Sequence, residues 1–124
     1  MEHLLKSIRR PDITFCRDGR ILITAAVASA LHLQPGDGIN IYAYGGEYYI
    51  YGVPNDNNYR YHAKVFRSKR GSSNFRASSS RLARRFLDAC GITAHRAAFA
   101  VGASVCLFGR TFIPIITKHP LDND

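Results

Sequence analysis

The sequence lacks any long apolar segment. No stretch approaches the roughly 20 consecutive apolar residues that a membrane-spanning helix needs. Beyond Met1, residues 1–10 contain only Leu4, Leu5 and Ile8 as large apolar side chains, together with four charged residues. This is too little for the apolar core of a signal peptide. We therefore expect a cytoplasmic protein that has no membrane partner.

Cysteine is scarce, with three residues at Cys16, Cys90 and Cys106. The number is odd, no two of them form a CxxC pair, and no histidine pair lies close by. This pattern predicts neither a disulfide framework nor a zinc site. We expect buried free thiols that pack as small apolar side chains in a reducing compartment.

Motifs of catalysis are also missing. The five histidines are scattered and form no HxxxH or HExxH pattern, and no glycine-rich phosphate loop is present. The nine acidic residues are dispersed, whereas a metal-dependent nuclease needs clustered carboxylates. Three serines at 78–80 are better explained by helix capping than by a nucleophile. We expect a protein that is not an enzyme and that carries no metal or cofactor.

Charge is strongly unbalanced. Seventeen Lys and Arg against nine Asp and Glu give a net charge of +8, which favours polyanionic partners such as nucleic acid. The alternative is a solubilising surface without a partner. A length of 124 residues with 46% hydrophobic residues fits one globular domain over residues 1–124.

Residues 12–53 form the clearest structural unit. Alternating runs at 13–16 and 21–23 predict two strands joined by the Asp18-Gly19 turn. Thr24 is a suitable N-cap for a short helix rich in alanine. Pro35 and the two glycines that follow it force a turn before a second hairpin over 39–53.

This unit resembles the AbrB/SpoVT family of small DNA-binding regulators. The family pattern is present as Gly19–Thr24 (GRILIT), Leu31–Leu33 (LHL) and Pro35–Ile41 (PGDGINI). The resemblance implies a barrel of swapped-hairpin type and places Arg20, the arginine after the turn glycine, on the DNA-facing surface. In that family the barrel is normally built from two chains.

A second, divergent copy of the unit is expected over 75–117, after a connecting region at 54–74 that is first polar and then basic and includes a strand. Ser78 would cap a helix over 79–90, and Gly91 would end that helix. The predicted fold class is α+β, mainly β, a small swapped-hairpin barrel of two tandem strand-helix-turn-hairpin modules with short helices. Such a chain forms either an internal pseudo-dimer or a homodimer.

The cations that we expect to face phosphate cluster in the turn at 17–20, in the connecting region and on the second helix. They are Arg17, Arg20, Arg60, Lys64, Arg67, Lys69, Arg70, Arg76, Arg81, Arg84 and Arg85. Such contacts position a protein on DNA without reading its sequence. Two alternatives remain open: Arg20 could pair with Asp18 or Asp37, and the loop at 67–74 could be solvated and without function.

Five tyrosines gather on the hairpin at 39–53: Tyr42, Tyr44, Tyr48, Tyr49 and Tyr51. They could stack on the bases of a single strand, or they could form cross-strand pairs and a half-buried core. With the charge and the resemblance, the sequence predicts a DNA-binding transcriptional regulator that contacts duplex DNA through a basic surface. The alternative is a protein-binding module, such as an antitoxin or a phage or mobile-element inhibitor of a nucleic-acid enzyme.

Overall fold

The computed structural model describes residues 12–55, 62–118 and 120–123. Their elements are β1 (Ile13–Cys16), β2 (Arg20–Ile23), α1 (Ala25–Ala30), β3 (Gly38–Tyr44), β4 (Glu47–Val53), β5 (Ala63–Arg67), β6 (Phe75–Ser78), α2 (Ser80–Ala89), β7 (Arg96–Phe99), β8 (Val105–Leu107), β9 (Arg110–Ile115) and β10 (Asp122–Asn123). The prediction of a mainly β chain with two short helices is confirmed.

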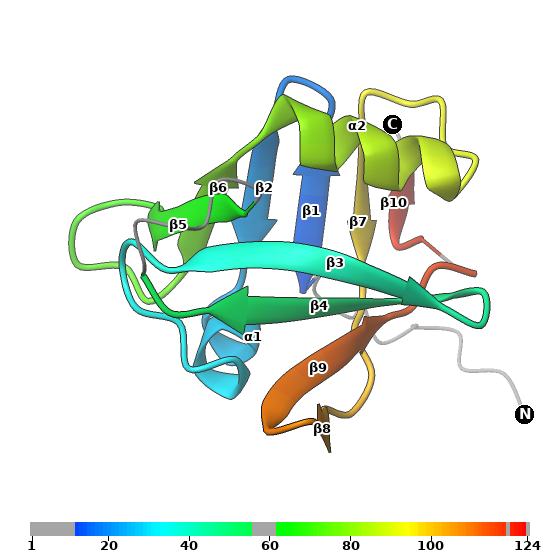
Figure 1. Ribbon diagram of the computed structural model, residues 1–124. Coiled ribbons are helices and arrows are strands. Elements are labelled where there is room, and N and C mark those ends of the chain that lie inside the picture. The colour runs from blue at the N-terminus through cyan, green and yellow to red at the C-terminus, as the bar shows by residue number, and fades with distance from the viewer. Residues whose placement is uncertain (1–11, 56–61, 119, 124) are drawn as a thin grey trace, which may run out of the picture.

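The strands form one antiparallel sheet in the order β10-β7-β1-β2-β6-β5-β3-β4-β9-β8. The sheet folds over itself, so that β3 and β4 run across the front of the molecule while β1, β2 and β7 stand behind them (Figure 1). Helix α2 covers the upper end of these rear strands, and α1 lies below β4. The core is enclosed between the two parts of the sheet.

The predicted closed barrel is wrong, because among the described strands the sheet ends at β10 on one side and at β8 on the other. Its two parts approach each other at one place, where an isolated bridge joins Val101 to Ile115. There the Gly102 amide donates to the Pro114 carbonyl at 2.8 Å and the Ile116 amide donates to the Ala100 carbonyl at 2.9 Å. After this contact the chain leaves extended geometry, and a regular ladder does not form between β7 and β9.

Strand alternation builds the core as the sequence predicts. Ile13 and Phe15 of β1 face the interior opposite Ile23 and Ile21 of β2, and all four side chains are buried. The ring of Phe15 lies 4.4 Å from that of Phe86 in α2, centroid to centroid, and the ring of Phe99 is 5.9 Å away. None of the described residues buries a charged side chain, so apolar packing dominates the interior.

The two helices begin at different kinds of cap. At α2 the Ser79 hydroxyl accepts from the Leu82 amide at 3.1 Å, so the cap predicted at Ser78 is one residue too early, because Ser78 still belongs to β6. At α1 the predicted N-cap Thr24 makes no side-chain cap bond. Instead the side-chain oxygen of Asn74 accepts from the Ala25 amide at 2.8 Å.

Both helices end in the same motif. His32 after α1 and Gly91 after α2 adopt left-handed backbone, with φ values of 56° and 72°. The next amide then reaches back to the helix, Leu33 to the Ala28 carbonyl and Ile92 to the Leu87 carbonyl, each at 2.9 Å. This is the hydrogen-bond pattern of a Schellman helix end, and it occurs once in each half of the chain.

We call β1–β4 the first half of the chain and β5–β10 the second half. Pairs of strands from the two halves alternate in the sheet. The first strand of one half, β1, pairs with β7 of the other, and β5 pairs in turn with β3. Two further ladders, β2 with β6 and β4 with β9, also join the halves. The halves therefore share one core, and neither forms a separate unit.

Candidate nucleic-acid interface

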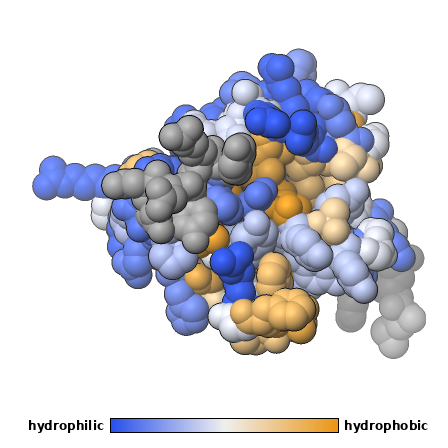
Figure 2. Space-filling model, viewed as in Figure 1, coloured by the Kyte–Doolittle hydropathy of each residue, from blue (hydrophilic) through white to orange (hydrophobic). Residues whose placement is uncertain are grey.

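Eight cations follow one another from Lys64 to Arg85 with no acidic residue between them. All eight are exposed. They belong to the β5–β6 hairpin and to α2, and we call them the basic surface: Lys64, Arg67, Lys69, Arg70, Arg76, Arg81, Arg84 and Arg85. Hydrophilic side chains accordingly cover α2 and the side of the molecule where this hairpin lies (Figure 2).

The hairpin presents its cations on the outer side of the sheet. Val65 and Ala77 point into the core, so that Lys64, Phe66 and Arg76 point outward by strand alternation. Phe66 is directly opposite Arg76 and is 54% exposed. Together these side chains line a shallow hollow of about 380 Å³.

The loop between β5 and β6 is tied at its base. Arg67 donates to the Ser72 carbonyl at 2.8 Å, and its guanidinium lies 5.5 Å from the centre of the Phe75 ring. The Ser68 amide donates to the Asn74 carbonyl at 2.9 Å. Arg67 therefore has a structural part in the loop, whereas Lys69 and Arg70 extend from its tip into solvent.

Helix α2 turns three arginines outward because Ala83, Phe86 and Leu87 face the core. Arg81 and Arg85, one helical turn apart, line a hollow of about 270 Å³ between α2 and β3. The imidazole of His62 lines the same hollow, and burial, followed by the nearby charge of Arg110, lowers its pKa. His62 is therefore neutral at pH 7 and adds no charge.

Arg17 makes hydrogen bonds to other residues of the protein. Only 24% of its side chain is exposed, and its guanidinium donates to the Asp88 carboxylate at 3.0 Å and to the carbonyls of Ala94, at 2.9 Å, and Ile92. Arg84 donates in turn to the carbonyl of Arg17 at 3.0 Å. These contacts lock the β1–β2 turn to the end of α2, so we leave Arg17 out of the interface.

Arg20 pairs with Asp18, which is one of the two partners considered for it from sequence. Its Nε lies 2.9 Å from a carboxylate oxygen, and both side chains are about half exposed. The backbone amide of Arg20 also donates to Asp18, and this bond is the main cause of the lowered pKa of that carboxyl. An exposed pair of this kind is weak, so Arg20 remains able to exchange Asp18 for a phosphate. Arg60 lies outside the described residues.

The tyrosines divide between the two roles considered for them. Tyr48 belongs to the core, where its ring meets that of Phe86 at 5.4 Å. Tyr42 and Tyr44 point to solvent and are 52% and 69% exposed. Sequence reasoning missed that Phe112 lies beside Tyr42 and that Arg110 lies over the ring of Tyr51. These neighbours depend on the pairing of β4 with β9, which spans about half the chain.

The cysteines differ in exposure. Cys16 is buried, Cys90 is half-buried and Cys106 is exposed, so the prediction of buried thiols is wrong for Cys106. Burial raises the pKa of the Cys90 thiol to about 11, which keeps it protonated and unreactive at neutral pH. Within the described ranges, no three histidine, cysteine or acidic side chains are grouped as a metal site would require.

Known proteins provide no match. No family model, no curated protein and no solved structure matches the chain. Across the part of the chain that the structure describes, no helix has the length and apolar character needed to cross a membrane.

Proposed function

We propose that this protein is a DNA-binding transcriptional regulator whose basic surface holds duplex DNA. One observation carries the proposal: eight exposed cations occupy a continuous hairpin and helix with no acidic residue among them. A surface of one charge sign attracts a polyanion over a distance of about 10 Å. The resemblance of residues 12–53 to the AbrB/SpoVT family supports DNA as that polyanion.

Each part of the basic surface suits a different contact. Arg81 and Arg85 project side by side from α2, so both can reach phosphates of one strand. Lys64 and Arg76 flank the exposed ring of Phe66 on the hairpin. Lys69 and Arg70 extend the surface beyond the globular body. These contacts position DNA, and they assign no base.

The fold supports an internal pseudo-dimer in place of a pair of chains. The reciprocal pairing of β1 with β7 and of β5 with β3 exchanges strands between the halves, as in a swapped-hairpin arrangement. The shared ending of the two helices supports the same two-module origin. In this arrangement the second module begins with β5, earlier than the start at residue 75 that the sequence predicts.

A titration of a fluorescently labelled duplex, followed by anisotropy, tests the proposed function. We expect binding at low ionic strength and a loss of affinity as salt rises from about 50 to 200 mM, because phosphate contacts release counterions. With the six side chains named above in contact with phosphate, log K should fall with log salt at a slope of about −5.4. No binding at low salt, or a flat dependence, would contradict the proposal.

A protein-binding module remains the second candidate function. The observation that favours it lies on another part of the sheet, where Tyr42 and Tyr44 of β3 and the aliphatic side chains of β8 are exposed. Exposed apolar patches of this kind mark interaction sites on many proteins.

A further inference from the structure

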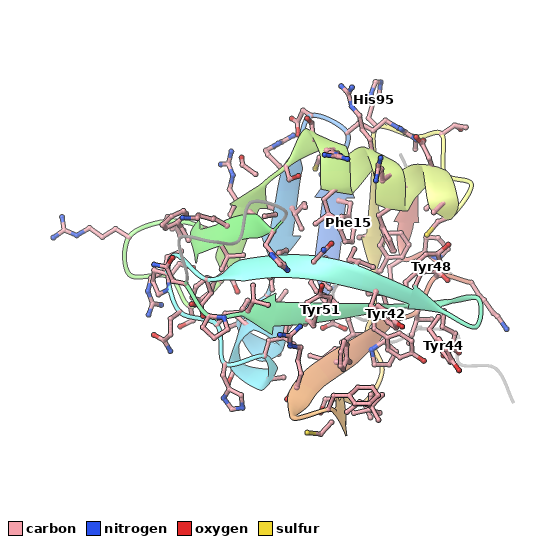
Figure 3. The ribbon with its side chains drawn as sticks, viewed as in Figure 1. Phe15, Tyr42, Tyr44, Tyr48, Tyr51 and His95 are labelled. Atoms are coloured by element: carbon pink, nitrogen blue, oxygen red, sulfur yellow. The ribbon has the colours of Figure 1, made fainter. Side chains whose placement is uncertain are left out.

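One side of the sheet carries a set of aromatic and aliphatic side chains that are exposed or half-buried. Cross-strand pairing places Tyr42 beside Tyr49, Tyr51 beside Phe112, and Phe112 beside Val105. We call this set, with the neighbouring turn, the aromatic face: Tyr42, Tyr44, Tyr49, Tyr51, Val105, Leu107, Phe108 and Phe112. Tyr42, Tyr44 and Tyr51 are visible along β3 and β4 in Figure 3, and the apolar end of the face appears in Figure 2 at the bottom of the molecule.

The rings of this face form a connected platform. Tyr42 and Tyr44 are nearly parallel, with an interplanar angle of 10° and centroids 6.4 Å apart. The ring of Phe112 lies 6.2 Å from Tyr42 and 5.4 Å from Tyr51. Neighbouring rings restrict one another's side-chain motion. Binding at this surface would therefore cost little side-chain conformational entropy.

Phe108 is the most exposed side chain of the face. Its ring is fully exposed, at 101% of the reference area, and its backbone has a φ of 54°. Gly109 follows with a φ of 73°, so both central residues of this turn are left-handed, where Asn-Gly is the favoured pair. A phenylalanine is strained at the first position, and its ring packs against none of the residues that the structure describes.

The charges of the face argue against nucleic acid. Glu47 and Arg110 are the only charged residues on the four strands, and a stacking platform for single strands also needs a cationic groove. Arg110 lies beside Tyr51, near one end of β4, whereas Glu47 lies at the other end of that strand. The two charges are therefore at opposite ends of the face. A face with opposite charges at its two ends is self-complementary about a central two-fold axis.

We propose that the aromatic face binds a second copy of this chain. The two copies are related by a two-fold axis, with Glu47 of each facing Arg110 of the other and the Phe108 turns packed into the contact. From aromatic side chains of about 150–250 Å² each, the exposed area is about 600 Å² per copy. Two copies would bury about 1,200 Å², the lower limit of standard interfaces. We therefore expect weak association that depends on protein concentration.

Sedimentation velocity of the full chain and of Phe108→Asn tests the role of the turn. The wild type should form dimers as concentration rises, and Phe108→Asn should weaken association at least tenfold, as expected for the loss of an aromatic side chain that becomes buried in the contact. Its melting temperature at a concentration where both proteins are monomeric should stay equal or rise, since asparagine suits the turn. A wild type that stays monomeric, or a variant that dimerises equally well, would overturn the proposal.

Mixing two charge variants tests the two-fold arrangement. Glu47→Arg and Arg110→Glu should each self-associate more weakly than the wild type, and an equal mixture should form heterodimers, because every facing pair then has opposite signs. The double variant should dimerise like the wild type. Lys118→Glu, a reversal outside the face, should leave association unchanged. If the mixture gains nothing, or if a single-stranded oligonucleotide binds the face and blocks association, the proposal fails.

Discussion

Replacing Arg81 and Arg85 together by glutamate should weaken duplex binding about 100-fold near 0.1 M salt. The estimate follows from counterion release, by which one phosphate contact contributes about tenfold at that salt concentration. Both side chains are exposed and line the same hollow beside α2. The slope of log K against log salt should become shallower by about 2, because two contacts are lost.

The matched control for this result is Lys118→Glu. Lys118 is also exposed, and its reversal changes the net charge as much as the single change Arg85→Glu. We expect a loss of about tenfold for Arg85→Glu and less than about twofold for Lys118→Glu. Equal losses would show that only total charge matters, and α2 would then have no special place in the interface. Circular dichroism of each variant checks that the fold is retained.

Phe15→Ala should lower the free energy of unfolding by about 3–5 kcal/mol, since it leaves a cavity in the centre of the core. The Phe15 side chain is fully buried and contacts the rings of both Phe86 and Phe99. These rings belong to α2 and β7, so the cavity lies where the two halves of the chain meet. Urea denaturation followed by far-UV circular dichroism measures the effect.

Phe66→Ala provides the comparison, because it makes the same chemical change at a side chain that is 54% exposed. We expect a loss of less than about 1 kcal/mol there. If the two variants were equally stable, Phe15 would not pack as the structure shows. The slope of the free energy of unfolding against urea concentration should be the same in both variants as in the wild type. This would confirm that the substitutions change stability and leave the cooperative unfolding transition intact.

Local features of the fold were predictable from sequence because their causes are local. The β1–β2 hairpin follows from alternation around Asp18-Gly19, and the turn before β3 follows from Pro35 and its glycines. The start of α2 was missed by one residue, because Ser78, Ser79 and Ser80 are all good caps and strand pairing decides among them.

Features that depend on distant residues were not predictable. Arg17 appears free in a turn, yet its partners Asp88, Ile92 and Ala94 are more than 70 residues away. The aromatic face depends on the pairing of β4 with β9, and the open ends of the sheet depend on where β8 and β10 pair. Charge patterning was the exception, since it located the basic surface without knowledge of the pairing.

A map of the duplex contact on the protein would test the central claim most directly. In a titration of isotope-labelled protein with duplex DNA, followed by amide chemical shifts, we expect the largest changes between Lys64 and Arg85. The amides of Tyr42, Tyr44 and Phe112 should shift little, because they belong to the aromatic face. Changes concentrated on β3, β4, β8 and β9, with the hairpin and α2 unaffected, would contradict the assignment of DNA to the basic surface.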